Sequence, residues 1–158
     1  MSDKESLHIL FVCTYRGARS RMAEIFAREV FGPEVLINSA CFQEGVIGGA
    51  PLRVMAELGL TMPTQSPTSV FTRFLAKERY DYVVALCDDF SERDCPVFKR
   101  SIDTLYGAES RRINWKIGDF ASLEGAQDAI DNKAREIRDQ VRTEVGNLAG
   151  SLNSANDS

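Results

Sequence analysis

The stretch Leu7-His-Ile-Leu-Phe-Val-Cys-Thr-Tyr-Arg-Gly-Ala-Arg-Ser20 decides the fold, because an apolar run ends in a cysteine and a helical pattern begins directly after it. The run from Ile9 to Val12 is rich in β-branched and aromatic residues, which predicts a short buried strand. Apolar residues then recur at helical spacing, at Met22, Ile25, Phe26 and Val30. The residues between Cys13 and Ser20 must therefore turn from a strand into a helix.

A strand-to-helix turn of this kind directs successive backbone N–H groups, together with the positive end of the helix dipole, toward one point. A tetrahedral anion such as phosphate or arsenate fits such a point. The predicted oxyanion-binding residues are those of the turn, namely Thr14, Tyr15, Arg16, Gly17, Ala18, Arg19 and Ser20.

Cys13 lies in the same electrostatic field, which favours the thiolate, the form of cysteine that attacks an electrophile. Arg19 can hold two oxygens of the anion with its forked guanidinium, and Ser20 can donate a hydrogen bond to the sulfur. The alternative is a buried structural cysteine beside a solvated arginine. The strand before Cys13 and the helix after it favour the catalytic interpretation.

The composition is that of one globular domain, since 44% of the 158 residues are hydrophobic and 27% are charged. We expect residues 1–149 to form this domain and the polar residues 150–158 to be a disordered tail. The net charge of -4 and the interleaving of acidic with basic residues argue against nucleic acid as a partner.

The cysteines are expected to be reduced. No apolar run is long enough to span a bilayer and the first residues carry no apolar signal segment, so we expect no membrane partner and a cytoplasmic location. Thiols in that compartment are free, catalytic or transiently paired rather than a structural disulfide framework. They are Cys13, Cys41, Cys87 and Cys95, of which Cys41 has no evident partner and is interpreted as a core or near-surface thiol.

Strand and helix patterns alternate along the rest of the chain. Strands are expected at 35–37, 80–86 and 112–115, and helices at 51–60, 70–77 and 125–148. This order predicts an α/β fold with a parallel sheet, helices on both faces, and a ligand site at the carboxyl ends of the strands. If the first and third strands are neighbours, we expect the sulfurs of Cys13 and Cys87 to face the same crevice.

Cys87 and Cys95 stand at the two ends of a polar, acidic segment. We predict no metal, because there is no second Cys or His pair and the single histidine, His8, lies at the far end of its strand. A redox interpretation fits better, since a thiol near Cys13 can displace a group from its sulfur and a third thiol can carry the resulting disulfide to the surface. Alternatively, both are small buried residues that flank a loop.

Asp119 follows the fourth predicted strand and is expected at the same crevice. A carboxyl group there can protonate the oxygen that leaves a bound anion, and burial against Trp115 or Phe120 would favour its protonated form. On the pattern alone, an aspartate after a glycine is also typical of a turn.

Together these residues resemble the low-molecular-weight protein tyrosine phosphatase fold family, and within it the thioredoxin-coupled arsenate reductases. The resemblance rests on Phe11 to Ser20 with the following Met-Ala-Glu, on Ser39-Ala40, Pro51, Met55 to Gly59, Val84 to Cys87, Cys95-Pro96, Trp115 to Asp119, and Ile137 to Asp139. It implies a three-layer α/β fold with a central four-stranded parallel sheet and an anion loop of the phosphatase type after the first strand.

The resemblance also implies an enzyme, an arsenate reductase without a cofactor. Cys13 is the implied nucleophile, Arg19 the anion-binding arginine and Asp119 the general acid. Cys87 then attacks Cys13 and expels arsenite, Cys95 attacks Cys87, and thioredoxin reduces the final disulfide. Glutaredoxin or a small thiol remains an alternative electron donor, and the sequence predicts no oligomeric state.

Two departures from the family pattern leave other functions open. Arg16 replaces the usual asparagine of the loop, so we predict no potassium site there, and Asp119 is followed by Phe120 rather than proline. The first alternative is a tyrosine phosphatase that hydrolyses aryl phosphates through a Cys13 phosphocysteine, which would leave Cys87 and Cys95 unexplained. The second is a non-enzymatic oxyanion-binding module whose loop is disabled by Arg16.

Overall fold

A four-stranded parallel sheet with strand order β2-β1-β3-β4 forms the centre of the molecule. The computed structural model describes residues 7–87, 105–106, 110–120 and 123–156. The strands are β1 (His8–Tyr15), β2 (Leu36–Gln43), β3 (Tyr82–Cys87) and β4 (Arg111–Lys116). The first and third strands are neighbours, as the site prediction required.

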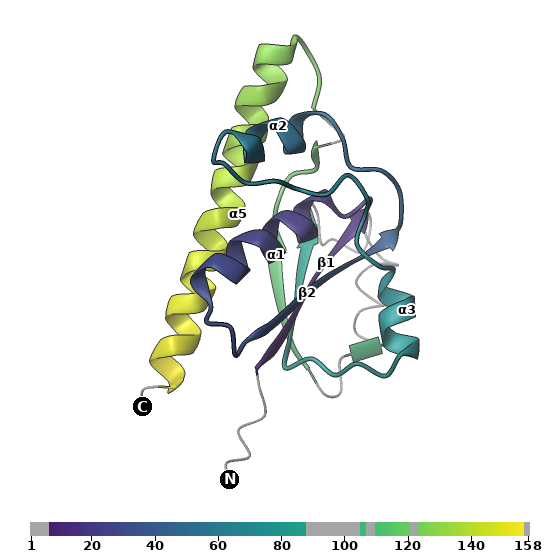
Figure 1. Cartoon of the computed structure of the whole chain (residues 1–158), viewed down its shortest axis with the longest axis vertical. Coiled ribbons are helices and arrows are strands. Elements are labelled where there is room, and N and C mark those ends of the chain that lie inside the picture. Colours follow the sequence, from purple (N-terminus) through teal and green to yellow (C-terminus); the bar gives the residue numbers. More distant parts are fainter. Residues whose placement is uncertain (1–6, 88–104, 107–109, 121–122, 157–158) are drawn as a thin grey trace.

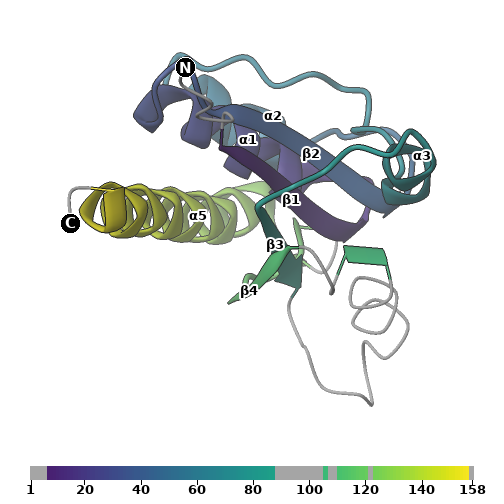
Figure 2. The same ribbon diagram turned by 90° about the horizontal axis from the view of Figure 1, so that it is seen from below.

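Helices cover both faces of this sheet (Figure 1). They are α1 (Ala18–Val30), α2 (Ala50–Ala56), α3 (Val70–Leu75) and α5 (Gln127–Asn156). Figure 2 shows α1 and the long α5 side by side on one side of the sheet, and α3 packs on the other side, where Val70 joins the cluster of Leu10 and Val12. The predicted three-layer α/β class is therefore confirmed.

The side chains of β1 alternate between two buried clusters, because successive residues of a strand point to opposite faces. Ile9, Phe11 and Cys13 pack with apolar residues of α1, α2 and α5. Leu10 and Val12 instead belong to the cluster on the α3 side. All five side chains have an exposed fraction of 0%, so β1 is buried on both faces, as a central parallel strand is.

Strand β2 continues to Gln43, well beyond the predicted end at Ile37. The prediction stopped because Asn38 and Ser39 interrupt the apolar pattern. The buried Ser39 hydroxyl, however, donates a 2.6 Å hydrogen bond to Glu24 of α1, so the polar side chain is satisfied inside the core.

Helix α5 extends to Asn156, which corrects the expectation of a tail beginning at Gly150. Leu148, Ala149 and Leu152 are all buried against the sheet-facing cluster. Their spacing continues the apolar stripe of the helix through Gly150, and tertiary packing outweighs the low helix propensity of glycine at this position.

We predict that Ser39→Ala lowers the free energy of unfolding by about 1.5–3 kcal/mol, because a hydrogen bond to a buried carboxylate is lost. Urea denaturation measures this change. Ser151→Ala, at an exposed position of α5, is the matched control and should shift the unfolding midpoint little. Equal effects of the two substitutions would contradict the assigned role of Ser39.

A candidate oxyanion site after strand β1

The turn after β1 is tighter than predicted, because β1 continues through Tyr15 and pairs there with Gln43 of β2. Only Arg16 and Gly17 lie between β1 and α1, and both have positive φ angles, 56° and 80°. The Arg16 N–H donates a 2.7 Å hydrogen bond to the Gln43 carbonyl. Two left-handed residues therefore reverse the chain from strand to helix.

Glycine is required at position 17 for two reasons. Its φ of 80° is unfavourable for residues with a Cβ. A Cβ here would also lie 2.2 Å from Cδ of Pro67, which is far closer than van der Waals contact allows. Because Gly17 has no side chain, the turn can pack directly against Pro67.

The first turn of α1 forms the candidate anion site. Backbone N–H groups in the first turn of a helix have no partner within the helix and carry the positive end of its dipole. These N–H groups belong to Ala18, Arg19 and Ser20, whereas the N–H of Arg21 already donates to the Gly17 carbonyl at 2.9 Å. The arrangement suits a phosphate or arsenate oxygen.

Cys13 lies below this helix start, with an exposed fraction of 0%. Its Sγ is 3.3 Å from Oγ of Ser20, the contact that the sequence predicted. The Ser20 hydroxyl also lies 3.2 Å from the Gly17 carbonyl and 3.0 Å from the Ala40 carbonyl. Ser20 therefore ties the sulfur to both the turn and β2.

Arg19 is buried to 1% exposure and bridges the turn to the segment after β4. One terminal nitrogen donates to the Ile117 carbonyl at 3.0 Å, and the other donates to Oγ1 of Thr14 at 3.1 Å. The second nitrogen also lies 3.7 Å from a carboxylate oxygen of Asp119. A guanidinium with five N–H groups can keep these contacts and still donate to a bound oxyanion.

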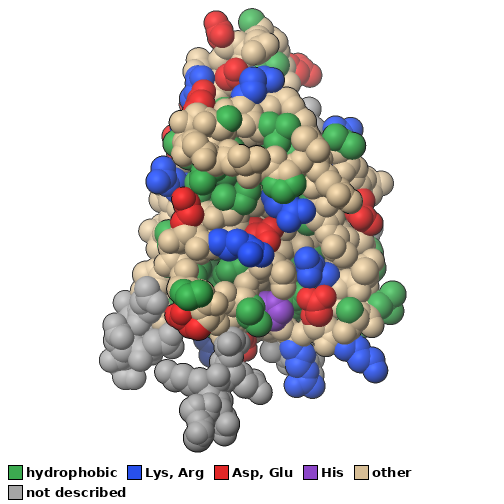
Figure 3. Space-filling view, in the orientation of Figure 1, with side chains coloured by type: hydrophobic (Ala, Val, Ile, Leu, Met, Phe, Trp, Pro, Cys, Tyr) green, Lys and Arg blue, Asp and Glu red, His purple; other side chains and the backbone are tan. Residues whose placement is uncertain are grey.

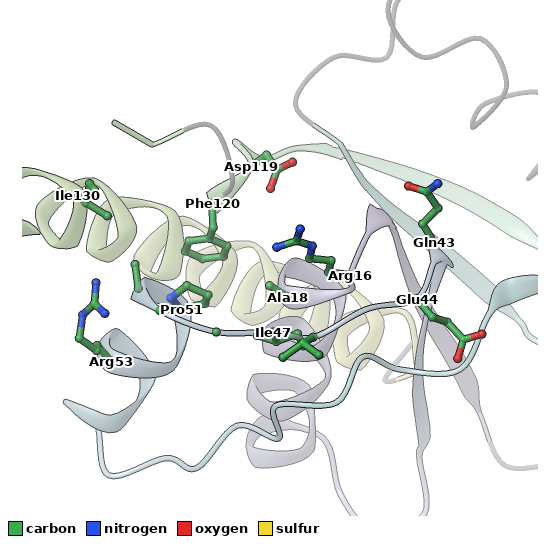
Figure 4. A pocket seen from close by; sticks show the side chains of 14 residues that line it. Arg16, Ala18, Gln43, Glu44, Ile47, Pro51, Arg53, Asp119, Phe120 and Ile130 are labelled. Carbon is green, nitrogen blue, oxygen red and sulfur yellow. The ribbon is translucent and has the colours of Figure 1, made fainter. Parts of the chain in front are cut away.

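Asp119 lines a pocket of about 680 Å³ in front of the turn (Figure 4). Its side chain is 23% exposed, and Phe120 stands beside it in the pocket wall. Arg16 extends from the turn toward this wall. The other lining residues are Ala18, Gln43, Glu44, Val46, Ile47, Gly48, Gly49, Ala50, Pro51, Arg53 and Ile130.

The structure places Cys87 at the predicted end of the sheet but on the other face. Cys13 is the register partner of Leu86, so Cys87 lies one residue further along β3. Because side chains alternate, Cys13 belongs to the cluster under α1 and Cys87 to the cluster near Val70 of α3. The expectation that both sulfurs face one crevice is therefore wrong for this conformation. Cys95 lies outside the described residues.

Cys41, interpreted from the sequence as a core or near-surface thiol, lies in the core beside Cys13. It is the register partner of Cys13 on β2 and is fully buried. Burial, together with the neighbouring Cys13 and Glu44, raises the pKa of the Cys41 thiol to about 12, and its Sγ lies 3.4 Å from the Pro67 carbonyl. The sequence offers one signal for its place beside Cys13, the alternation of Ser39 and Cys41 along a strand. That signal could be used only if β2 were known to continue beyond Ile37.

Acidic and basic side chains are interspersed on the face shown in Figure 3. Among the described residues, no group of three or more His, Cys, Asp and Glu side chains is placed to hold a metal ion. In the same part of the chain, every helix is too short or too polar to cross a membrane.

A family model described as low molecular weight phosphotyrosine protein phosphatase matches residues 8–157. The chain belongs to this family. An arsenate reductase of Bacillus subtilis is 27% identical over 145 residues, which cover 92% of this chain and 96% of that protein.

Two solved structures share the fold. The tyrosine phosphatase Wzb of Escherichia coli K30 matches with a TM-score of 0.67 and 17% identity, over 92% of this chain and 97% of its own. A thioredoxin-dependent arsenate reductase of Corynebacterium glutamicum matches with a TM-score of 0.64 and 19% identity, over 98% of this chain and 65% of its own. The fold thus carries both chemistries.

We predict that Gly17→Ala weakens binding of inorganic phosphate by about ten-fold or more and costs about 1–3 kcal/mol of stability, since strain at a positive φ is of that size and Pro67 must move. Calorimetric titration and urea unfolding measure the two effects. Gly146→Ala, in an open position of α5, is the control and should leave both unchanged or slightly raise stability. Wild-type phosphate affinity in Gly17→Ala would show that the turn is not the anion site.

Proposed function

We propose that this protein reduces arsenate to arsenite through thiol chemistry at Cys13. The observation that carries the proposal is the place of Cys87, which ends β3 directly beside β1 and one residue past the register partner of Cys13. A phosphatase of this fold needs no such second thiol. The similarity to named arsenate reductases supports the same choice.

In the first step, arsenate binds at the N-terminus of α1, with Arg19 donating to its oxygens. The Cys13 thiolate attacks arsenic, and Ser20 stabilises the thiolate through the 3.3 Å contact. Asp119 lies 3.7 Å from Arg19 and is placed to protonate the departing oxygen, which leaves as water. The product of this step is a covalent sulfur–arsenic adduct.

In the second step, the Cys87 sulfur attacks the Cys13 sulfur. A Cys13–Cys87 disulfide forms, the sulfur–arsenic bond breaks, and its electron pair stays on arsenic, which leaves as arsenite. Since the two side chains lie on opposite faces of the sheet, this step requires the end of β3 to rotate Cys87 around the carboxyl edge. The distance along the sheet is short, because β1 and β3 are adjacent.

In the third step, Cys95 attacks Cys87 and frees Cys13, and thioredoxin reduces the Cys87–Cys95 disulfide. Thioredoxin as the partner is supported by the similarity to the thioredoxin-dependent reductase of Corynebacterium glutamicum. The cycle requires a compartment that keeps thiols reduced, and we place the protein in the cytoplasm for this reason.

We also propose that Arg16 contributes positive charge at the mouth of the site. Its side chain lines the pocket, and its φ of 56° is a left-handed conformation that is uncommon outside glycine. Such backbone outliers cluster at functional sites. A fixed cation here would attract the oxyanion and repel a potassium ion.

Hydrolysis of an aryl phosphate is the second candidate function, and the pocket favours it. The pocket of about 680 Å³ reaches the turn at Arg16 and Ala18 rather than Cys13 itself, so it has room for the organic part of an aryl phosphate, and Phe120 beside Asp119 offers a ring for stacking. The same Cys13, Arg19 and Asp119 would act through a phosphocysteine. Both activities can coexist in one site.

We predict steady NADPH consumption when the protein is combined with arsenate, thioredoxin and thioredoxin reductase. Cys95→Ser should abolish this turnover but still release about one arsenite per chain, because the first two steps do not use Cys95. Phosphate binding without any turnover or arsenite release would instead identify a non-enzymatic oxyanion-binding module.

Cys87→Ser should abolish arsenate turnover while leaving aryl phosphate hydrolysis within about two-fold, since a phosphocysteine is resolved by water rather than by a thiol. Initial rates with p-nitrophenyl phosphate and with arsenate measure the two activities on the same preparation. Loss of both activities, or of neither, would contradict the separate roles of Cys13 and Cys87.

A further inference from the structure

A second thiol lies closer to Cys13 in the sheet than Cys87 does. Cys41 on β2 is the register partner of Cys13, whereas Cys87 is offset by one residue on β3. Register partners of parallel strands point to the same face, so the Cys13 and Cys41 side chains both lie under the turn and α1. Both are fully buried.

The spacing of the two strands suits a disulfide between these residues. Neighbouring strands lie about 4.8 Å apart. Disulfides join residues whose Cα atoms are about 4.4–6.8 Å apart. The Cα spacing of the pair therefore fits a disulfide without a change of register, and the bond requires the two Cβ atoms to approach to about 3.8 Å.

The turn and the start of α1 lie close to both cysteines. A Cβ on Gly17 would lie 3.5 Å from Cβ of Cys41, and Oγ of Ser20 lies 3.3 Å from Sγ of Cys13. The Ser20 hydroxyl also donates a 3.0 Å hydrogen bond to the carbonyl of Ala40, the residue directly before Cys41. Both thiols are thus buried beside the turn that forms the candidate anion site.

The two thiols differ in chemical state. Cys13 lies beside the N-terminus of α1, with its Sγ 3.3 Å from Oγ of Ser20, whereas Cys41 has no such neighbour in the helix and its Sγ lies 3.4 Å from the Pro67 carbonyl. Burial raises the pKa of Cys41 to about 12, so Cys41 is protonated at neutral pH and is not the first of the two thiols to be oxidised. Oxidation therefore begins at Cys13.

We propose that Cys41 captures oxidised Cys13 as a reversible disulfide when the protein meets a hydroperoxide. The Cys13 thiolate attacks the outer peroxide oxygen, a sulfur–oxygen bond forms, and the oxygen–oxygen bond breaks, which yields a sulfenic acid and, after proton uptake, water or an alcohol. The Cys41 thiol then gives its proton to the departing hydroxide while its sulfur attacks the Cys13 sulfur. The sulfur–sulfur bond forms, the sulfur–oxygen bond breaks, and the hydroxide leaves as water.

This disulfide blocks the nucleophile and protects it at the same time. A sulfenic acid that finds no thiol is oxidised further to sulfinic acid, which dithiols do not reduce. The Cys13–Cys41 disulfide is restored by a dithiol reductant. The inference goes beyond the proposed reductase and does not require arsenate chemistry, so the two fail or succeed independently.

The test uses the full chain, reduced and then treated with hydrogen peroxide at one equivalent. Free thiols are trapped with N-ethylmaleimide, and the digested protein is mapped by mass spectrometry. The expected product is a peptide pair joined through Cys13 and Cys41, two hydrogens lighter than the reduced pair. The same linkage should form in Cys87→Ser, which removes the competing thiol.

Cys41→Ser and Cys41→Ala are the decisive variants. For this comparison the peroxide is raised to several equivalents, because sulfinic acid needs at least two per thiol. After this treatment and then dithiothreitol, wild type should regain its p-nitrophenyl phosphate activity, whereas both variants should remain inactive and carry sulfinic acid at Cys13. Circular dichroism confirms their fold, and if either is unfolded, the linkage maps of wild type and Cys87→Ser decide alone. A Cys13–Cys87 linkage in place of Cys13–Cys41, the absence of any disulfide at Cys13, or equal recovery in the variants would overturn the proposal.

Discussion

The buried guanidinium of Arg19 is the constraint on which the site depends. A charge at 1% exposure is costly unless it is paired and hydrogen-bonded, so its partners are held in place by the penalty for losing them. Those partners are Thr14 after Cys13, the Ile117 carbonyl after β4, and Asp119 at 3.7 Å. Arg19 thereby joins two segments into one site, although Arg19 and Ile117 are 98 positions apart in the sequence.

Local features of this site could be predicted from the sequence because they depend on neighbouring residues. The apolar run before Cys13 and the helical spacing after Ser20 define a strand and a helix, and any chain that joins them must turn between the two. The contact between Cys13 and Ser20 follows from that turn alone. The tight form of the turn, with left-handed Arg16 and Gly17, depends instead on Gln43 and Pro67, which are distant in sequence.

Features that depend on strand register could not be predicted in the same way. In the sequence, the polar Ser39 indicates the end of a strand. In the structure, β2 continues through Ser39 because its hydroxyl donates a hydrogen bond to Glu24. Without that length, Cys41 has no place in the sheet. Likewise, the pattern located Cys87 at a strand end but could not determine its face, since a shift of one residue moves a side chain to the opposite face.

That one-residue offset has a chemical consequence. On β2 the register partner of Cys13 is a cysteine, and on β3 it is a leucine with the cysteine one residue later. A thiol on the same face can reach Cys13 without moving the strand, whereas a thiol on the other face must first rotate around the end of β3. In the proposed mechanism, the sheet separates Cys87 from Cys13 while an oxyanion binds, so the thiol exchange would be a conformational step that is distinct from the chemistry of anion attack. The fold therefore allows Cys13 two different thiol partners, distinguished by whether the sheet lies between them.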